Sequence, residues 1–258
     1  MSEFNTVWIA SIPRTGSMWT TNVIRQIFLK SNYNILPKDM LKSDDAWINF
    51  YNQNALSDLN NLNRYIIKTH STISKNLTRS KIITNIRNPY HICSSYYQFT
   101  KCEIDEALKV ADILKKFIDF LSKKKTDLLK VKFEEIENNS YNLIKKIVDF
   151  CENDLSEDDI LNIDRDLKKD KVKMLINKND EILRNKIKNK ENINQNEIVI
   201  FNKKRFRSHD TNTGFQTGHI SLNENKEWKK IFKDKDIEKM ISILDPIAIE
   251  MGYSSEKN

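Results

Sequence analysis

The sequence predicts an α/β fold, with a central, mainly parallel β-sheet flanked by helices in a single domain. Short apolar, β-prone runs alternate along the chain with stretches whose apolar residues recur at helical spacing. Strands that alternate with helices indicate a parallel sheet with both faces covered. The length of 258 residues fits one large α/β domain. We therefore expect one domain over residues 1–258, with an α/β core at 1–155 and a helical and loop part at 156–258.

The first strand and the first helix frame a tight turn. Residues 7–12 are apolar and β-prone, and residues 19–30 carry apolar side chains on one helical face. Between them stands Gly16, one of only four glycines in the chain. A strand that enters a helix through such a turn leaves backbone N–H groups exposed at the helix N-terminus. These groups and the helix dipole form a natural anion site.

The later elements follow from the same patterns. Further strands are predicted at residues 65–68, 81–86 and 128–133, and helices at 90–99, 104–122 and 140–150. Residues 156–196 are predicted to form amphipathic helices of limited burial. A last helix is expected over residues 237–251, where Pro246 should kink or restart it.

The net charge of +7 is concentrated in one segment. Residues 162–207 carry 14 Lys and Arg against 7 Asp and Glu, which leaves the rest of the chain neutral. A neutral body with one basic stretch suits an anionic ligand or partner, and the plain alternative is a solvated basic surface.

The three cysteines, Cys93, Cys102 and Cys151, lack metal-ligand spacing and are odd in number. They are typical of reduced thiols in a cytoplasmic protein, and no metal site is expected. The first residues are polar and no run approaches 18 apolar residues. We therefore expect a cytoplasmic protein with no signal peptide and no membrane span.

Polar residues close the second and third predicted strands. Lys68 and His70 end one, and Arg87 ends the other, with Ser95 eight residues further on. Ligands of open parallel sheets bind beyond the carboxyl ends of the strands. A histidine there could take a proton from a hydroxyl, and an arginine could hold a phosphate. The alternatives are a packed histidine bonded to a carbonyl and an arginine paired with a surface carboxylate.

Together, three stretches resemble the PAPS-dependent sulfotransferases, which use 3′-phosphoadenosine 5′-phosphosulfate (PAPS). Residues 12–19, Ile-Pro-Arg-Thr-Gly-Ser-Met-Trp, resemble the 5′-phosphosulfate loop of that family. Residues 68–70 are similar to its Lys-Thr-His, and residues 87–89 with Ser95 resemble its 3′-phosphate motif. The resemblance covers about the first hundred residues well. It implies a fold of P-loop-NTPase-like topology.

The resemblance also implies a reaction and a role for each matching residue. PAPS would be the donor, without a metal, and the sulfuryl group would pass in line to an acceptor hydroxyl or amine. His70 would be the general base, Lys68 would stabilise the sulfuryl oxygens, and Arg14 would neutralise the leaving phosphate. The cofactor-binding set is Arg14, Thr15, Gly16, Ser17 and Met18 at the 5′ end, Trp19 at the adenine, and Arg87 and Ser95 at the 3′-phosphate.

Three positions depart from the family pattern. Arg14 stands where cytosolic members carry lysine, and an arginine should not release a proton to the leaving phosphate. Phe133 replaces a tyrosine, so it can pack near the adenine without donating a hydrogen bond. The late Arg-Lys-Gly loop has no clean equivalent, and we expect Arg207 to supply a third 3′-phosphate ligand, a surface turn being the alternative.

Two glycines after Arg207, Gly214 and Gly218, suggest a flexible closing loop. His219 follows them as a second site histidine or an ordinary loop histidine. Trp47 and its aromatic neighbours could line an acceptor pocket or belong to the core.

Two other functions are possible on the residues alone. A P-loop-like kinase would need a Gly-Lys-Ser/Thr tail, which the turn at Gly16 lacks. A nucleic-acid-binding protein could use the basic segment, but that reading leaves the three motifs unexplained. In the leading interpretation the acceptor is a small molecule or a carbohydrate-type compound, and no nucleic-acid partner is expected. No sequence pattern identifies the particular acceptor or the oligomeric state.

Overall fold

The computed structural model describes residues 4–73, 77, 79–123, 127–201, 205–220 and 225–256. Its central sheet has five strands in the order β2-β3-β1-β4-β5, and all four neighbouring pairs are parallel. The predicted α/β fold with a mainly parallel sheet is confirmed. The strands are β1 (Thr6–Ala10), β2 (Asn34–Leu36), β3 (Asn63–Thr69), β4 (Ser80–Ile86) and β5 (Leu128–Lys132).

The central strand β1 lies between β3 and β4. Ala10 is paired with Thr69 on β3, and Ile9 is paired with Ile83 on β4. Because the three strands are parallel, their carboxyl ends meet at one edge of the sheet. The chain leaves β1 for one side of the sheet and later returns to the other side, so this edge is a topological switch point.

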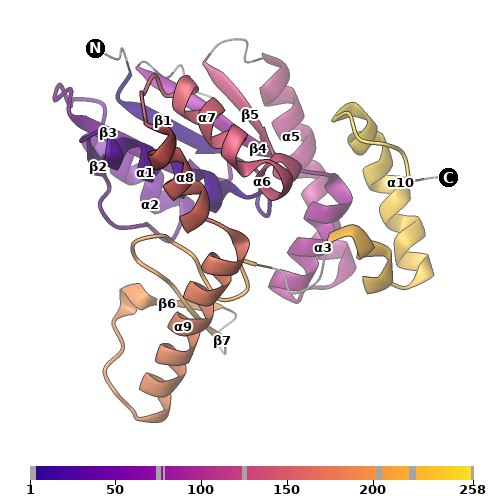
Figure 1. Cartoon of the computed structure of the whole chain (residues 1–258). Helices are drawn as coiled ribbons and strands as arrows, with labels where there is room; N and C mark the ends of the chain where they lie inside the picture. The colour runs from indigo at the N-terminus through magenta and orange to yellow at the C-terminus, as the bar shows by residue number, and fades with distance from the viewer. Residues whose placement is uncertain are drawn as a thin grey trace.

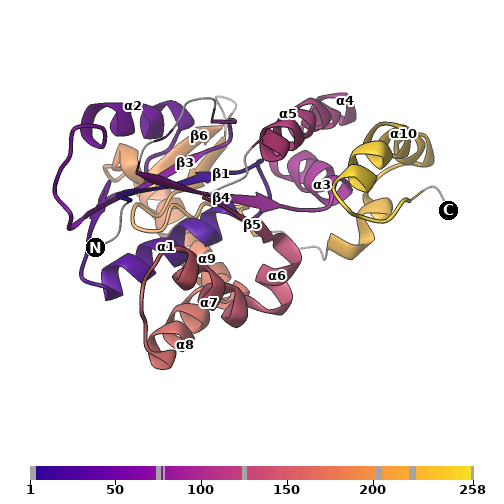
Figure 2. The ribbon, with the colours of Figure 1, turned by 90° about the horizontal axis from the view of Figure 1, so that it is seen from above.

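Helices cover both faces of the sheet, which Figure 2 shows nearly edge-on. Each face encloses its own hydrophobic cluster, as expected for a parallel sheet buried on both sides. One layer holds α1 (Ser17–Lys30), α6 (Phe133–Asn138), α7 (Ser140–Phe150) and α8 (Glu157–Asp166); the other holds α2 (Asp44–Asn54), α3 (Pro89–Thr100), α4 (Ile104–Leu108) and α5 (Val110–Lys123), with α10 (Asp234–Glu250) beside it.

Residues 169–201 and 205–207 of the basic segment form a lobe below the sheet (Figure 1). Its long helix α9 (Lys169–Lys188) buries only Val172, Ile176 and Leu183, so the expectation of amphipathic helices with limited burial is met. An antiparallel pair, β6 (Ile198–Phe201) and β7 (Arg205–Ser208), was not predicted. Two 3₁₀ helices flank this pair along the chain, η1 (Gln195–Glu197) before it and η2 (Asn225–Ile231) after it.

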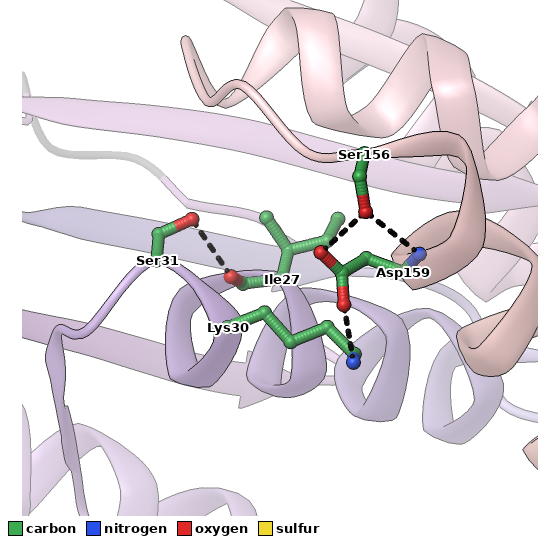
Figure 3. A network of polar contacts seen from close by, with 5 residues as sticks. All are labelled: Ile27, Lys30, Ser31, Ser156 and Asp159. Atoms are coloured by element: carbon green, nitrogen blue, oxygen red, sulfur yellow. Dashed lines mark hydrogen bonds and ion pairs between the residues drawn. The ribbon is translucent and has the colours of Figure 1, made fainter.

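A polar network joins the end of α1 to the start of α8 (Figure 3). Lys30 Nζ lies 2.8 Å from Asp159 Oδ1. Ser156 caps α8, since its Oγ accepts the Asp159 N–H at 3.1 Å and donates to Asp159 Oδ2 at 2.7 Å. Ser31 Oγ donates to Ile27 O at 3.0 Å and closes α1. The hydrogen bond from Lys30 is the main reason that the pKa of Asp159 is lowered.

Some element boundaries differ from the sequence-based expectations. The strand predicted at 128–133 ends at Lys132, and Phe133 opens α6 instead. The helix predicted at 104–122 is two helices that meet at Lys109. Pro246 lies within one uninterrupted α10, where burial of Leu244 and Ile247 offsets the backbone bond that proline cannot make.

No helix in these described ranges is both long enough and apolar enough to cross a membrane.

Candidate active site

The turn between β1 and α1 presents an uncapped helix N-terminus at the carboxyl edge of the sheet. Gly16 is the N-cap residue of α1, with φ 90° and ψ 12°, and no side chain caps the helix. Thr15 Oγ1 donates to Ile12 O at 2.7 Å and is fully buried, so this hydroxyl closes the turn. The first N–H groups of α1 therefore have no side-chain acceptor, which is the arrangement that anions occupy.

Gly16 also permits a close approach between this turn and α6. A Cβ atom built on Gly16 would lie 2.7 Å from Ile136 Cδ1 and 3.2 Å from Phe133 Cδ2. Both the positive φ and the lack of space require glycine here. The glycine thereby fixes Phe133 beside the anion-binding turn.

A lysine and a histidine are paired at the end of β3. Lys68 Nζ lies 2.8 Å from His70 Nε2, and His70 Nδ1 lies 2.8 Å from Ser11 O. Since a carbonyl can only accept, we assign the imidazole proton to Nδ1, so Nε2 carries the lone pair and accepts from Lys68. His70 therefore presents a basic nitrogen to the site.

Burial and charge lower the pKa of both members of this pair, so that His70 is neutral while Lys68 remains an ammonium at neutral pH. Burial, and then the Lys68 ammonium, lower the pKa of His70 to about 4. Burial lowers the pKa of Lys68 to about 8, and Asp44 opposes that shift. The Asp44 carboxylate, at the start of α2, accepts the His70 backbone N–H at 2.6 Å and the Thr69 hydroxyl at 3.1 Å. Asp44 thus anchors the strand end that carries His70.

Arg87 is fixed between the turn and α6. Its Nη1 donates to Arg14 O at 2.7 Å, and its guanidinium lies 3.8 Å from the centre of the Phe133 ring. Its Nε is buried and has no partner among the described residues. Burial lowers the pKa of Arg87 to about 10, and Glu137 and Glu134 oppose the shift. A buried guanidinium with an unused donor is prepared for an anion.

Arg14 extends from the turn towards α3 and the loop of residues 209–220, which follows β7. Its Nε donates to Ser95 Oγ at 3.0 Å, and its Nη2 donates to Gly218 O and His219 O, both at 3.3 Å. Its guanidinium lies 4.2 Å from the centre of the Phe99 ring. Burial, followed by repulsion from Arg87 and Arg207, lowers the pKa of Arg14 to about 9.

Arg207 completes a group of three guanidinium groups. Its Nη2 donates to Phe99 O at 2.5 Å, and its guanidinium lies 3.7 Å from the centre of the same ring. Neither Arg14 nor Arg87 forms an ion pair with a carboxylate in the described part of the chain. Three guanidinium groups held this close together give a positive field at the site, as the mutual repulsion that lowers the pKa of Arg14 shows.

These groups surround one cavity of about 1170 Å³ at the carboxyl edge of the sheet. The walls include nearly all of the residues that the sequence singled out. The exceptions are Thr15, whose hydroxyl closes the turn, and Arg207, which reaches the cavity residue Phe99. The sequence-selected residues in the wall are Arg14, Gly16, Ser17, Met18, Trp19, Lys68, His70, Arg87, Ser95 and Phe133.

Two residues of this site were missed at the sequence level. Asp44 was missed because α2 was not predicted; the available signal was Ser43, whose side chain accepts the Ala46 N–H as an N-cap. Phe99 was expected only as a helix residue, and its contact with two arginines brings together residues far apart in the chain. Trp47 is 2% exposed and also borders the cavity, so it belongs to both the core and the wall.

Among the described residues, no group of three or more His, Cys, Asp and Glu side chains could hold a metal ion.

Comparison with known proteins gives a family match over most of the chain. The family model described as a sulfotransferase domain matches residues 4–247. No match was found among curated proteins.

Solved structures share the fold at low sequence identity. A mouse sulfotransferase, SULT7A1, complexed with PAP is 16% identical, with a TM-score of 0.60 over 96% of this chain and 84% of that one. A retinol dehydratase in complex with androsterone and the inactive cofactor PAP is 13% identical, with a TM-score of 0.54 over 94% of this chain and 80% of that one. A second retinol dehydratase structure, with retinol and PAP, has a TM-score of 0.56 at 13% identity and covers 94% and 81% of the two chains.

Proposed function

Because the chain belongs to the sulfotransferase domain family, we propose that it transfers a sulfuryl group from PAPS to a hydroxyl or amine acceptor, with His70 as the general base. One observation carries the proposal. The ends of β1, β3 and β4 bring Gly16, His70 and Arg87 to the wall of a single cavity. An anion site, a base and a second anion site are thus available to one nucleotide.

The 5′ end of the donor fits the turn at the start of α1. The uncapped N–H groups after Gly16 would bind the 5′-phosphosulfate, with Ser17 and Met18 in the first helical turn. Trp19 lines the cavity and would lie against the adenine, as would Phe133, which packs against Gly16 of the turn.

The 3′-phosphate fits the buried guanidinium of Arg87. The unused Nε of Arg87 and the hydroxyl of Ser95 would be two of its ligands, and Arg207 would be the third. Ser95 now accepts from Arg14. We therefore expect Arg14 to turn from Ser95 to the 5′-phosphate when the nucleotide binds, because a phosphate is the stronger acceptor.

The reaction needs one further change, at Lys68. In this structure Lys68 donates to His70 Nε2, the atom that must accept the proton. We expect the Lys68 ammonium to move to the sulfuryl oxygens, which frees the His70 lone pair. The acceptor proton then passes to Nε2 as the new O–S bond forms and the bond from sulfur to the 5′-phosphate oxygen breaks. Arg14 neutralises the leaving phosphate, and positioning and charge stabilisation carry the catalysis.

The acceptor is proposed to be a small molecule or a carbohydrate-type compound. The retinol dehydratase structures hold retinol and androsterone, which are small molecules with a hydroxyl group. The cavity here is large enough for a nucleotide with an acceptor beside it.

Ligand-induced stabilisation tests the donor site. PAP at 100 times its Kd should add about 2.7 kcal/mol to the free energy of unfolding. ATP with magnesium and an oligonucleotide serve as control ligands, and we expect little effect from either. Stabilisation by ATP with magnesium, without an effect of PAP, would refute the proposed donor.

The variant His70→Asn tests the base. Its side-chain amide can keep the hydrogen bond to Ser11 O but cannot accept the acceptor proton. With labelled PAPS and a panel of hydroxyl and amine acceptors, we expect turnover to fall by about a hundredfold or more while the Kd for PAP stays within about twofold. His209→Asn is the control, because His209 makes a similar Nδ1 contact with a carbonyl, that of Asn196, at 2.9 Å. Full turnover by His70→Asn would remove His70 from the role of base.

A further inference from the structure

The loop of residues 209–220 carries a second histidine, His219, to the cavity wall. The carbonyl oxygens of Gly218 and His219 both accept from Arg14 Nη2. The His219 ring lies 5.8 Å from the Phe99 ring and 6.4 Å from the Phe215 ring, between centres. His219 is therefore attached to the anion-binding turn through its backbone and packed through its ring.

The loop itself is held at several points. Asn22 on α1 donates to Thr213 O at 2.8 Å, and Met40 donates its backbone N–H to Thr211 O at 2.7 Å. Thr217 donates to Asp180 on α9 at 2.9 Å. These bonds tie the loop to three separate parts of the chain, so the position of His219 is preorganised.

The hydrogen bonds of His219 identify its tautomer. The Gln216 backbone N–H donates to His219 Nδ1 at 3.2 Å. Since Nδ1 accepts, the proton of the neutral ring is on Nε2. Within the described ranges, Nε2 has no hydrogen-bond partner. His219 thus has one N–H donor to offer to the cavity.

The surroundings keep this imidazole neutral. Burial, followed by repulsion from Arg14 and Lys68, holds the pKa of His219 well below 6.5. His70, in contrast, carries its proton on Nδ1, and its Nε2 is an acceptor, which in this structure accepts from Lys68. The site therefore has two neutral histidines with opposite roles at Nε2, an acceptor just after β3 and a donor on the loop.

On the basis of the proposed function, we propose that His219 is a second catalytic residue, whose Nε2–H donates a hydrogen bond to an oxygen of the sulfuryl group during transfer. His219 lies close to Arg14 and Lys68, the residues assigned to the leaving phosphate and to the sulfuryl oxygens. No proton leaves His219 in the step. The acceptor proton goes to His70, one O–S bond forms, one breaks, and the His219 donor stabilises charge on the sulfuryl oxygens.

Two amide variants separate the donor from the structural role. In His219→Asn the amide stands at the position of Nδ1, so it can accept the Gln216 N–H but cannot reach the position of Nε2. In His219→Gln the amide reaches the position of Nε2 and restores the donor. Loss of one such preorganised donor lowers kcat by about 10²–10³ in other enzymes. We expect a loss of about a hundredfold in His219→Asn and of less than about tenfold in His219→Gln.

Binding measurements need no acceptor and complete the test. The Kd for PAP, which has no sulfuryl group, should stay within about twofold in both variants, and the Kd for PAPS should rise only in His219→Asn. Equal turnover of the two variants would overturn the proposal. Equal losses of affinity for PAP and for PAPS would also overturn it, because they would indicate that His219 only supports the structure of the loop. A change confined to the KM of the acceptor would overturn it as well.

The same assay distinguishes the two proposals. A wild-type protein that binds PAP but transfers no sulfuryl group to any acceptor would refute the proposed function. Active wild type with unaffected His219→Asn would refute only the role of His219.

Discussion

The close contact of the anion-binding turn with α6 predicts a specific effect of Gly16→Ala. An L-residue in the left-handed region costs about 1–2 kcal/mol, and Gly16 has φ 90°. The added Cβ would also lie 3.2 Å from Phe133 Cδ2 and 2.7 Å from Ile136 Cδ1. The terminal methyl of Ile136 can rotate away, so overpacking should cost about 1–2 kcal/mol, at the low end of the usual range. We expect a total loss of about 2–4 kcal/mol.

The chain offers a matched control in Gly252→Ala. Gly252 has a similar φ of 81°, but a Cβ there would meet nothing within 4 Å. In this variant the free energy of unfolding should fall only by the cost of the left-handed backbone conformation, about 1–2 kcal/mol. At about 2–4 °C per kcal/mol for a chain of this size, calorimetry or urea unfolding resolves the difference. Equal destabilisation of the two variants would refute the close approach between the turn and α6.

A functional consequence should accompany the loss of stability. The ring of Phe133, which must move in Gly16→Ala, is the ring on which Arg87 lies at 3.8 Å. We expect Gly16→Ala to weaken the binding of PAP by about tenfold or more, which is the effect of losing one charge-assisted hydrogen bond. Gly252→Ala should leave the Kd for PAP unchanged. Unchanged affinity in Gly16→Ala, measured on folded protein, would show that the turn and Phe133 do not shape the nucleotide site.

Three other predictions concern the charged groups of the site. The pKa of His70 is about 4 when folded and about 6.5 when unfolded, so the unfolded chain binds more protons between these values. His70 alone should lower the free energy of unfolding by about 3 kcal/mol as the pH drops through this window, and His70→Asn should make the dependence measured by urea unfolding shallower. An identical slope in the variant would contradict the lowered pKa. Arg14→Lys cannot reproduce the hydrogen bonds to Ser95 and to the two loop carbonyls together, so amide exchange over residues 214–220 should become faster; unchanged protection would show that Arg14 does not hold the loop. Arg87→Ala should weaken the binding of PAP by about tenfold or more. It should weaken the binding of adenosine 5′-phosphosulfate much less, because that compound lacks the 3′-phosphate; equal losses of affinity would argue against a 3′-phosphate contact.

Much of the site was accessible from the sequence because its residues follow strands. Each of three apolar runs ends in a polar group, and parallel strands bring such ends to one edge. Gly16, Lys68, His70 and Arg87 could be selected on that rule and on the family resemblance alone. The boundaries were less secure at Phe133, where a strand pattern continues by one residue into what the structure makes a helix.

Short or irregular elements gave no usable pattern. The strand Asn34–Leu36 spans three residues and shows no periodicity that a loop would lack. The helix that begins at Asp44 has a capping serine but a weakly apolar face, and so the carboxylate that anchors His70 was not recognised. β6 pairs with β7, and β7 also contacts α9, a tertiary contact that no local pattern encodes.

The sequence by itself determined the α/β alternation, the glycine turn between the first strand and the first helix, and the placement of a histidine and an arginine at strand ends, because each depends on neighbours within a few positions along the chain. Only the tertiary structure decided which nitrogen of each histidine carries the proton, that Arg14 contacts both Ser95 and the 209–220 loop, and that Arg87 keeps one buried donor unused. Apart from the His219 tautomer, which depends on Gln216 three positions away in an irregular loop, these properties arise from contacts between segments tens to hundreds of positions apart, where packing rather than local propensity fixes the geometry.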